Sequence, residues 1–389
     1  MSATDRAAPR TSPAARSAEK SSPAGPGHGW TVLGLVIVVG LAAAGRQLSE
    51  SMPALAAGTP LSGVVAAIEY PVYAIALGFA GNAVLSLARV RERMAAAFRT
   101  EFFIKIGLVL LGATVSFAVL VRAAGPAVLQ AIVLITVVFG ATWWFAGALG
   151  LDDRLRALLA SALAICGVSA AVAAAGAVQA RKEQLAYTAA LVITFAVPSI
   201  FLLPWLADLM ELSPAVTGAW IGGNIDTTAA VTAAGEVAGE QPLQIASIVK
   251  VTQNALLGVV AVLLTIWFSL RTAQDGGSAA EGQRGGRASL ALIWDRFPKF
   301  VLGFLITSAI ATVSVETIPA EVLEPRLDAA KELQTWALTL AFVSIGLEFN
   351  ASSIREAGVR PILVFFVATV VNLVVGLLLA LVLFQGFTF

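Results

Sequence analysis

Cysteine, histidine and charged side chains are scarce in this sequence of 389 residues, and each scarcity excludes a kind of chemistry. The one cysteine, Cys166, has no second cysteine to pair with, so an intrachain disulfide is excluded. The one histidine, His28, lies near the N-terminus, before the first apolar run. Metal sites built from His and Cys clusters, and nucleophiles activated by a membrane histidine, are therefore excluded.

The few charges are nearly balanced, with 25 Lys and Arg against 24 Asp and Glu, so nucleic acid is not an expected partner. Hydrophobic residues make up 58% of the chain, more than a water-soluble globule can bury. We therefore predict an all-α polytopic membrane protein, because a bilayer core needs about 20 apolar residues per helix. The apolar runs predict about 11 transmembrane helices, near residues 30–44, 62–88, 101–121, 127–149, 155–180, 184–207, 215–235, 243–270, 298–315, 333–350 and 360–384.

A weak internal repeat relates the two halves of the chain. Ala76–Asn82 (ALGFAGN) resembles Ala219–Asn224 (AWIGGN), and the following helices share a lysine, Lys105 or Lys250, before a Leu-Leu-Gly. Five helices separate the two units, which predicts two inverted five-helix repeats after one extra N-terminal helix. Chance recurrence of small residues and Leu is the alternative.

The predicted segments are a disordered basic cytoplasmic tail (1–29), helix 1 with an outer loop (30–61), repeat 1 with helices 2–6 (62–207), the first part of repeat 2 with helices 7–8 (208–271), a cytoplasmic loop with an interfacial helix (272–297), and the rest of repeat 2 with helices 9–11 (298–389). Helix 1 could also be a cleaved signal sequence, although the tail before it is long for one.

Lys and Arg gather in alternate loops, as the positive-inside tendency requires. With the N-terminus in the cytoplasm and the C-terminus outside, 17 basic residues fall on the cytoplasmic side and six outside. Arg181 and Lys182 fall on the wrong side. The prediction is a multi-pass protein of the plasma or inner membrane.

Asp226 is the acidic residue whose position in a predicted span most needs explaining. Counting from Ser213 places it near the bilayer midplane, where a charged side chain is costly. Glycines and small polar residues surround it: Gly222, Gly223, Asn224, Thr227 and Thr228. A helix interrupted here predicts a coupling-ion site, with sodium held by Asn224 and Asp226 or a proton on the carboxylate. The alternative is a close helix-packing surface in which Asp226 pairs with a lysine.

Lys250, Gln253 and Asn254 lie at i, i+3 and i+4, so they project from one face of their predicted helix. A fixed cation beside amide donors suits an anionic substrate. It would equally suit a counter-charge for Asp226, or a purely structural ion pair.

Two further segments predict helix interruptions. Cys166, Gly167 and Ser169 interrupt an Ala-rich helix, and a helix beginning after such a break directs unsatisfied N–H groups at an anion. Ser344 and Gly346 form a matching segment five helices later. Glu348 follows them, as an ion-coupling group or as a carboxylate at the headgroups.

At these residues the chain resembles the YeiH family, also named UPF0324, whose members are described as sulfate exporters. The resemblance covers nearly the whole chain from about residue 60. Three segments carry it: Ile165–Ala170 (ICGVSA), Trp220–Gly235, and Val249–Thr252 (VKVT). It implies a fold related to bile-acid and sodium–proton transporters, with interrupted helices crossing near Cys166 and Ser344.

This chain departs from the family pattern at three positions. Asp226 stands where the family has histidine, Thr227 replaces an acidic residue, and Gln253 replaces an arginine. Losing an arginine weakens the case for a divalent anion, while a bare aspartate suggests a sodium or proton site. We therefore expect a divergent member.

Together these observations predict a secondary transporter, not an enzyme, that carries a small anion such as sulfate, sulfite, a sulfonate or a small carboxylate by alternating access. The coupling ion is sodium or a proton, no other cofactor is expected, and a homodimer is a candidate assembly. A cation–proton antiporter is the main alternative. An intramembrane enzyme would need Ser169 activated by Lys250 or an Asp pair, and a passive channel or sensor is a further alternative.

Overall fold

The computed structural model describes residues 28–57, 70–274, 297–349 and 358–389, and every regular element in these ranges is a helix. The predicted basic tail, the first part of helix 62–88 and the predicted interfacial helix lie outside them. The helices are α1 His28–Ala56, α3 Tyr70–Leu87, α4 Arg91–Met94, η2 Ala95–Ala97, α5 Thr100–Leu111, α6 Phe117–Ala148, α7 Asp153–Ala164, α8 Val168–Val178, α9 Lys182–Leu209, α10 Pro214–Asn224, α11 Thr228–Ala238, α12 Glu240–Ala255, α13 Leu257–Gln274, α15 Phe300–Thr317, α16 Ala320–Glu348 and α18 Val359–Phe384.

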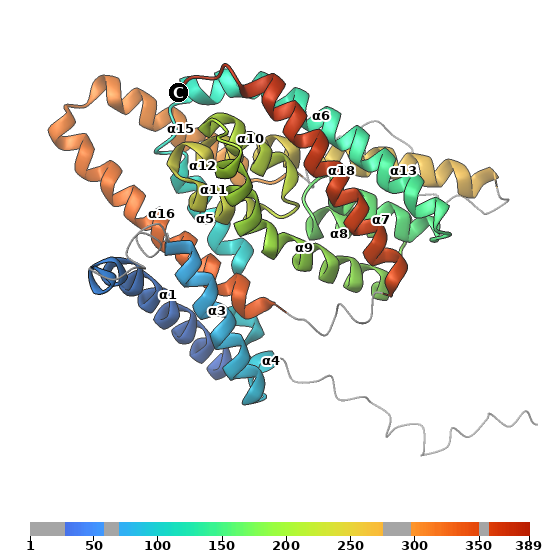
Figure 1. Cartoon of the computed structure of the whole chain (residues 1–389), viewed down its shortest axis with the longest axis horizontal. Coiled ribbons are helices and arrows are strands. Elements are labelled where there is room, and N and C mark those ends of the chain that lie inside the picture. The colour runs from blue at the N-terminus through green and yellow to red at the C-terminus, as the bar shows by residue number, and fades with distance from the viewer. Residues whose placement is uncertain (1–27, 58–69, 275–296, 350–357) are drawn as a thin grey trace, which may run out of the picture.

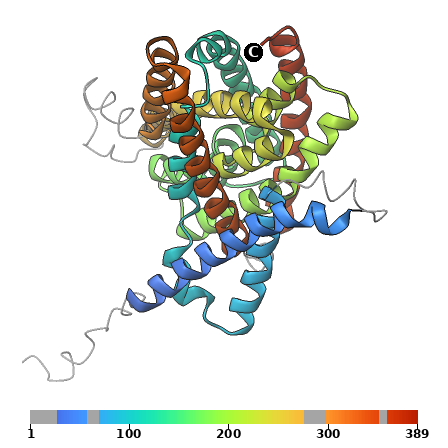
Figure 2. The ribbon, with the colours of Figure 1, turned by 90° about the vertical axis from the view of Figure 1, so that its left-hand side faces the viewer.

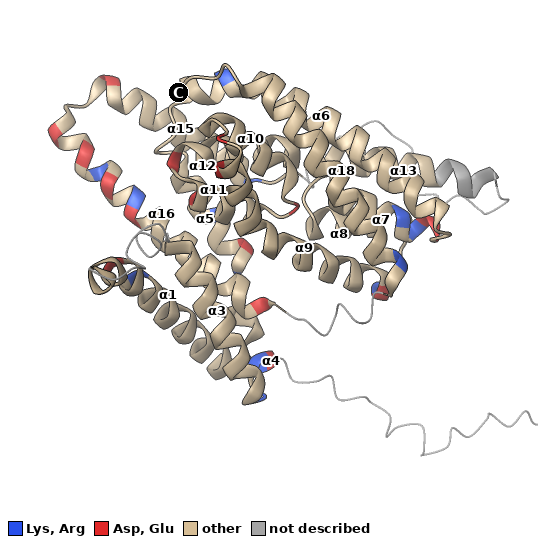
Figure 3. Cartoon of the chain, viewed as in Figure 1, with Lys and Arg blue, Asp and Glu red and all other residues tan. Residues whose placement is uncertain are grey.

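Seven segments of the described chain are long and apolar enough to cross a membrane: α1, α3, α6, α9, α12 with the start of α13, α15 and α18. Their outward faces carry large apolar side chains such as Trp144, Leu263 and Val382, which suit contact with lipid. Figure 3 shows acidic and basic residues mostly near helix ends and along the first half of α16. The prediction of an all-α polytopic membrane protein is confirmed.

The predicted span 155–180 is instead a helical hairpin. Arg154, near the start of α7, donates from Nη1 to the carbonyl of Gln179 at 3.0 Å, just after α8 ends. Gln184 at the start of α9 bonds to Asp152 before α7. Both ends of α7–α8 therefore lie at the same end of the molecule. Helices of 12 and 11 residues reach about 17 Å at 1.5 Å per residue, so each goes in and returns without crossing.

The predicted span 215–235 is a second hairpin, as its packing on α12 shows. Gly218 of α10 packs against Pro242 and Gly222 packs against Ala246, so α10 and α12 run in the same direction.

The other leg of this hairpin runs the opposite way along α12. Gly235 near the end of α11 packs against Leu243 near the start of α12. Thr228 at the start of α11 accepts a hydrogen bond at 3.0 Å from Asn254 near the end of α12. Because α11 is antiparallel to α12, and α10 is parallel to it, α10 and α11 form a hairpin with residues 225–227 at its tip. Two of the predicted crossings are thus replaced by hairpins.

The hairpins predict which loops share a side of the membrane. In a background without Cys166, cysteines introduced for Arg154 and Glu183 should react with an impermeant maleimide from the same side. A cysteine for Met210, at the far end of α9, should react from the opposite side. All three positions are exposed. Labelling of positions 154 and 183 from opposite sides would restore a crossing at 155–180.

The helices form two bundles. The hairpin bundle contains α6–α13 and α18; the flanking bundle contains α1, α3, α4, η2, α5, α15 and α16. In Figure 1 α7, α8 and α13 of the hairpin bundle lie to the right of α1, α3 and α4 of the flanking bundle, and Figure 2 shows α1 and α16 of the flanking bundle crossing on the face toward the viewer.

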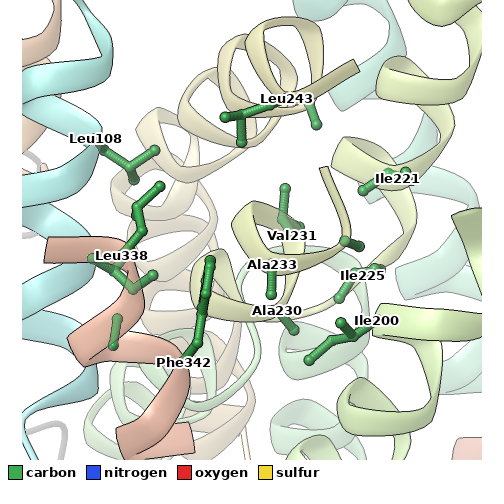
Figure 4. Packing of buried hydrophobic residues seen from close by; sticks show 14 of the residues in the cluster. Leu108, Ile200, Ile221, Ile225, Ala230, Val231, Ala233, Leu243, Leu338 and Phe342 are labelled. Atoms are coloured by element: carbon green, nitrogen blue, oxygen red, sulfur yellow. The ribbon is translucent and has the colours of Figure 1, made fainter. Parts of the chain in front are cut away.

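The two bundles meet mainly through α11, which packs on α5 and α16. In Figure 4 apolar side chains of α11 lie between those of α16 and those around α9 and α10: Ala230, Val231 and Ala233 from α11, Leu338 and Phe342 from α16, and Ile200, Ile221 and Ile225 on the other side. This contact is apolar, with small side chains on α11 and larger ones on α16, so it presents few polar links between the bundles.

The predicted interruption at Ser344 is wrong, because α16 continues without a break to Glu348. The Ser344 hydroxyl donates to the carbonyl of Leu340, one turn earlier, at 2.8 Å. Gly346 packs directly against the backbone of Gly78 in α3. The small residues of this segment therefore serve close helix packing, as small residues in membrane helices often do.

The boundary expected between residues 121 and 127 is also displaced. α5 ends at Leu111, and α6 begins at Phe117 and continues past Pro126 for 32 residues. The intervening turn is held by α15, where Ser308 donates to the carbonyl of Val115 at 2.7 Å and Thr312 accepts from the Phe117 N–H at 2.9 Å. These bonds satisfy a carbonyl of the turn and the first N–H of α6, which have no helical partners.

Helix α1 is longer than the predicted 30–44 and belongs to the flanking bundle. Gly45 packs against the backbone of Ala74 in α3. Arg46 pairs with Glu332 of α16 at 2.5 Å and lies 5.0 Å from the ring centre of Trp336. An ion pair and a cation–π contact from one side chain attach α1 to α16.

Candidate functional site

The tips of the two hairpins touch at the centre of the hairpin bundle. Gly167, at the first tip, has φ +62°, a conformation that glycine adopts readily. A Cβ atom at this residue would lie 3.1 Å from Cγ2 of Thr227 and 3.4 Å from the carbonyl oxygen of Asp226, both at the second tip. Because Gly167 has no side chain, its backbone can lie directly against Thr227 and the Asp226 carbonyl at the second tip.

Lys250 of α12 connects the two tips on the side where α7 and α10 end. Its ammonium donates to the carbonyl of Ile165 at 2.6 Å, to the carbonyl of Ile225 at 2.9 Å and to Oε1 of Gln253 at 2.8 Å. The side chain is 1% exposed. A lysine ammonium has three N–H donors, so all three are used. The cation lies at the C-terminal ends of α7 and α10, where the helix dipoles are negative.

Two side-chain amides cap further carbonyls at the ends of α7 and α10. Gln253 donates from Nε2 to the carbonyl of Ala164 at 2.9 Å, and Asn372 of α18 donates to the carbonyl of Asn224 at 3.0 Å. Together with Lys250 they satisfy the last carbonyls of both half-helices, which a buried helix end requires. Asn372 was not predicted from the sequence, because an isolated asparagine in an apolar helix gives no pattern.

A cavity of about 380 Å³ lies in front of the tips, between the two bundles. The hairpin bundle contributes Cys166, Val168, Ser169, Ile193, Ala196, Val197, Thr227–Ala230, Asn254 and Leu257, and the rest comes from Pro298 and the flanking bundle, Thr100, Glu101, Ile104, Lys105, Phe300, Ile345 and Glu348. Both α8 and α11 begin at this cavity. Their first N–H groups have no partner within the helix, and their dipoles are positive at these ends.

Polar side chains of the hairpin bundle face the same cavity. Asn254 is 4% exposed; it donates to the Thr228 hydroxyl at 3.0 Å, and its Oδ1 has no hydrogen-bond partner. The hydroxyl of Thr227 accepts from the N–H of Ala230 at 3.1 Å and caps α11. The cavity thus offers hydroxyl and amide groups next to two helix N-termini.

Carboxylates lie on the flanking side of the cavity. Glu101 pairs with Lys105 one turn later at 2.9 Å, and the Ser169 hydroxyl is 3.5 Å from the other Glu101 oxygen. Glu348 is the last residue of α16 and lines the cavity. Since Glu101 is the second residue of α5, the hairpin tips lie level with one end of the flanking bundle.

Asp226 lies at the second tip, 6% exposed and directly before Thr227. Among the residues that the structure describes, its carboxylate makes no hydrogen bond and no ion pair within 4 Å. Lys250 is its nearest candidate partner by sequence reasoning, yet the ammonium gives its three donors to other groups. No counter-charge in the described structure therefore neutralises this carboxylate by direct contact.

Asn224 lies behind the tip and does not line the cavity. Its Nδ2 donates to the carbonyl of Trp220 at 3.0 Å, its Oδ1 has no partner, and Gly376 of α18 packs against the amide. Among the described residues no group of three or more His, Cys, Asp or Glu side chains could hold a metal ion.

The structure therefore separates the predicted site residues into three places. Those that line the cavity are Cys166, Ser169, Thr227, Thr228, Asn254 and Glu348. Those that lie at the tips or behind them are Gly167, Asn224, Asp226, Lys250 and Gln253. Ser344 and Gly346 lie on α16, where Gly346 contacts α3, and neither lines the cavity.

Several residues that line the cavity were not predicted from the sequence. Thr100, Glu101 and Phe300 stand at helix starts, where polar or aromatic residues are ordinary, and Ile193 and Val197 look like lipid-facing residues of α9. Glu101 and Lys105, four residues apart on one helix, have the spacing of an ordinary surface ion pair. Only the packing of one bundle against the other brings these residues to the cavity.

The comparisons with known proteins agree with the motifs. A family model described as Conserved hypothetical protein 698 matches residues 33–365, most of the chain. The chain belongs to the UPF0324 family of membrane proteins. The resemblance inferred from the three segments is confirmed.

Individual UPF0324 relatives match over much of the chain. The UPF0324 membrane protein RB9488 of Rhodopirellula baltica is 34% identical over 325 residues, covering 82% of this chain and 58% of that protein. One UPF0324 membrane protein of Nitratidesulfovibrio vulgaris is 33% identical over 298 residues, covering 74% and 50%. The UPF0324 membrane protein TauZ of Paracoccus denitrificans is 30% identical over 304 residues, covering 76% and 83%. The chain thus spans about half the length of the first two. No solved structure matches.

Proposed function

We propose that this chain is a secondary active transporter that carries a small anion by alternating access. The observation that supports it most is the convergence of two helix N-termini, those of α8 and α11, on one cavity between two bundles. Paired N-termini form an anion site from backbone N–H groups and helix dipoles. The cavity volume of about 380 Å³ suits a small anion such as sulfate, sulfite, a sulfonate or a small carboxylate.

The proposed movement is a displacement of the hairpin bundle along the flanking bundle. The contact between them is apolar and centred on α11, so sliding breaks few polar bonds. At the end opposite the cavity, Tyr70 donates to Glu236 at 2.8 Å and Lys331 pairs with Glu240 at 3.0 Å, joining the two bundles. This pattern is that of a carrier open at one end and closed at the other.

The open end is proposed to face the cytoplasm. Because the first hairpin returns to its starting side, Arg181 and Lys182 join Arg154 and Arg156 on that side. In the predicted topology Arg181 and Lys182 fell outside; with the hairpin they no longer do. The basic residues left outside are Arg46, Arg122, Arg326 and Lys331. The positive-inside tendency then favours a cytoplasmic N-terminus and an outer C-terminus more strongly.

The carboxylates of the cavity favour a proton as the coupling ion. An anion close to ionised Glu348 or Glu101 is repelled, and a proton taken up with the anion removes this repulsion; Asp226, next to the lining residue Thr227, acts in the same direction. The same carboxylates keep a cation–proton antiporter as the second candidate. A sodium-dependent current in proteoliposomes that contain no transportable anion would favour that second function.

Cys166 tests the site directly, because it is the chain's single cysteine and lines the cavity. A small anionic thiosulfonate reagent should modify it from the cytoplasmic side of inside-out vesicles and stop anion uptake, while right-side-out vesicles react at least tenfold more slowly. A transported anion should protect the thiol. Intact mass and flux are the measurements.

The Cys166→Ser variant is the control. The reagent should not change the anion uptake rate of this variant, even if that rate differs from the wild-type rate. Equal reaction from both sides without protection by any of the anions would contradict the proposed site.

A further inference from the structure

The ammonium of Lys250 lies among three oxygens that belong to three different helical segments. Two are main-chain carbonyls at the ends of α7 and α10, at 2.6 and 2.9 Å, and one is the Gln253 amide oxygen of α12 at 2.8 Å. All of them are buried within the hairpin bundle, and the lysine side chain is 1% exposed. This is a built cation site whose occupant is covalently part of the chain.

Those oxygens are of the kind that bind a free alkali cation. Main-chain carbonyls at the ends of interrupted membrane helices, where the helix dipoles are negative, commonly coordinate sodium in transporters. Here both helix ends point at one place, so a positive charge is needed there for the tips to stay together. A lysine supplies that charge without any ion from solution.

We infer that the Lys250 ammonium permanently takes the place of a coupling cation at the hairpin tips. Its charge balances the ends of α7 and α10 through the whole transport cycle, so no sodium ion is needed at this point. The main-chain carbonyls of Asn224 and Ile225 already accept from Asn372 and Lys250, so the end of α10 leaves neither of them free for a sodium ion. The consequence for coupling rests on the proposed transport function, but the cation site itself does not.

The test is to remove the ammonium and supply a cation from solution. In purified Lys250→Ala, the three oxygens face a space that Na⁺ or Li⁺ can enter. NaCl, compared with choline chloride at equal ionic strength, should raise the Tm of this variant saturably by several degrees. The wild-type protein should show no difference between the two salts.

Two controls separate a filled site from a general salt effect. Lys250→Met keeps most of the side-chain volume without the charge, so it should be destabilised yet indifferent to sodium. Lys182→Ala, at an exposed position at the start of α9 and away from the cavity, should behave like the wild type. A folded Lys250→Ala that does not distinguish sodium from choline would overturn the inference, as would a wild-type protein stabilised by sodium to the same extent.

A flux measurement on the wild type keeps the inference testable if Lys250→Ala does not fold. Anion uptake with sodium replaced by choline on both sides should change less than twofold, and a tenfold loss would overturn the inference. If no anion is transported under any condition, the proposed function fails. The Tm comparison would still decide the cation site, because it needs no transport.

Discussion

Replacing Gly167 with alanine should lower the anion transport rate at least tenfold and lower the Tm. At φ +62° and ψ −120° the residue has a backbone conformation that a Cβ atom makes costly, by about 1–2 kcal/mol. The new Cβ would also lie 2.7 Å from Cγ1 of Val192 and 3.1 Å from Cγ2 of Thr227. Overpacking of this kind typically costs about 1–3 kcal/mol, and here it separates the two hairpin tips.

Gly150→Ala is the matched control, because Gly150 has φ +71° but no atom within 4 Å of an added Cβ. This variant has backbone strain without a steric clash, so it should lower the Tm and leave the flux within twofold of wild type. Flux in proteoliposomes and Tm in detergent measure both effects. Equal flux in Gly167→Ala and Gly150→Ala would show that the tip contact is not needed for transport.

The sequence predicted where two helices break. It did not predict whether the chain then crosses the membrane or returns to the side from which it came. Gly167 and the segment around Asp226 were predicted as interruptions, and both are. Hydropathy cannot distinguish a broken helix that crosses from a hairpin that returns, because the apolar composition is the same. Arg181 and Lys182 carried the missing information: basic residues on the wrong side of a predicted span indicate that the span returns.

The interruption predicted at Ser344 failed for a different reason. Ser and Gly in a membrane helix are used both at breaks and in close packing, and only the partner decides between these uses. Gly78 lies opposite Gly346, so here the use is packing. Residue spacing worked better for Lys250 and Gln253, which were predicted on one helix face and do bond to each other. That both would face the tips, and not the cavity, needed the tertiary structure.

Asp226 and Lys250 together give the hairpin tips an unusual charge distribution. The ammonium lies on the side of the helix C-termini, with every donor used, while the carboxylate lies at the second tip without a direct partner in the described residues. Burying an ionised side chain in a membrane protein costs about 2.5–3.5 kcal/mol even on lenient scales. The lysine charge is therefore compensated structurally, whereas Asp226 has no compensating charge in direct contact among the described residues, which makes it the better candidate for coupling.

Asp226→Asn should consequently separate gradient-driven uptake from simple exchange. The amide nearly preserves the shape of the carboxyl group and cannot release a proton, so a pH gradient should no longer drive anion accumulation, a loss of at least tenfold. Exchange of internal for external anion, which needs no net proton movement, should continue within a few-fold of wild type. Asp208→Asn, the same substitution at an exposed position near the end of α9, should retain both activities. Accumulation by Asp226→Asn that follows the pH gradient as the wild type does would assign proton coupling to another group, with Glu348, on the opposite wall of the cavity, as the next residue to replace.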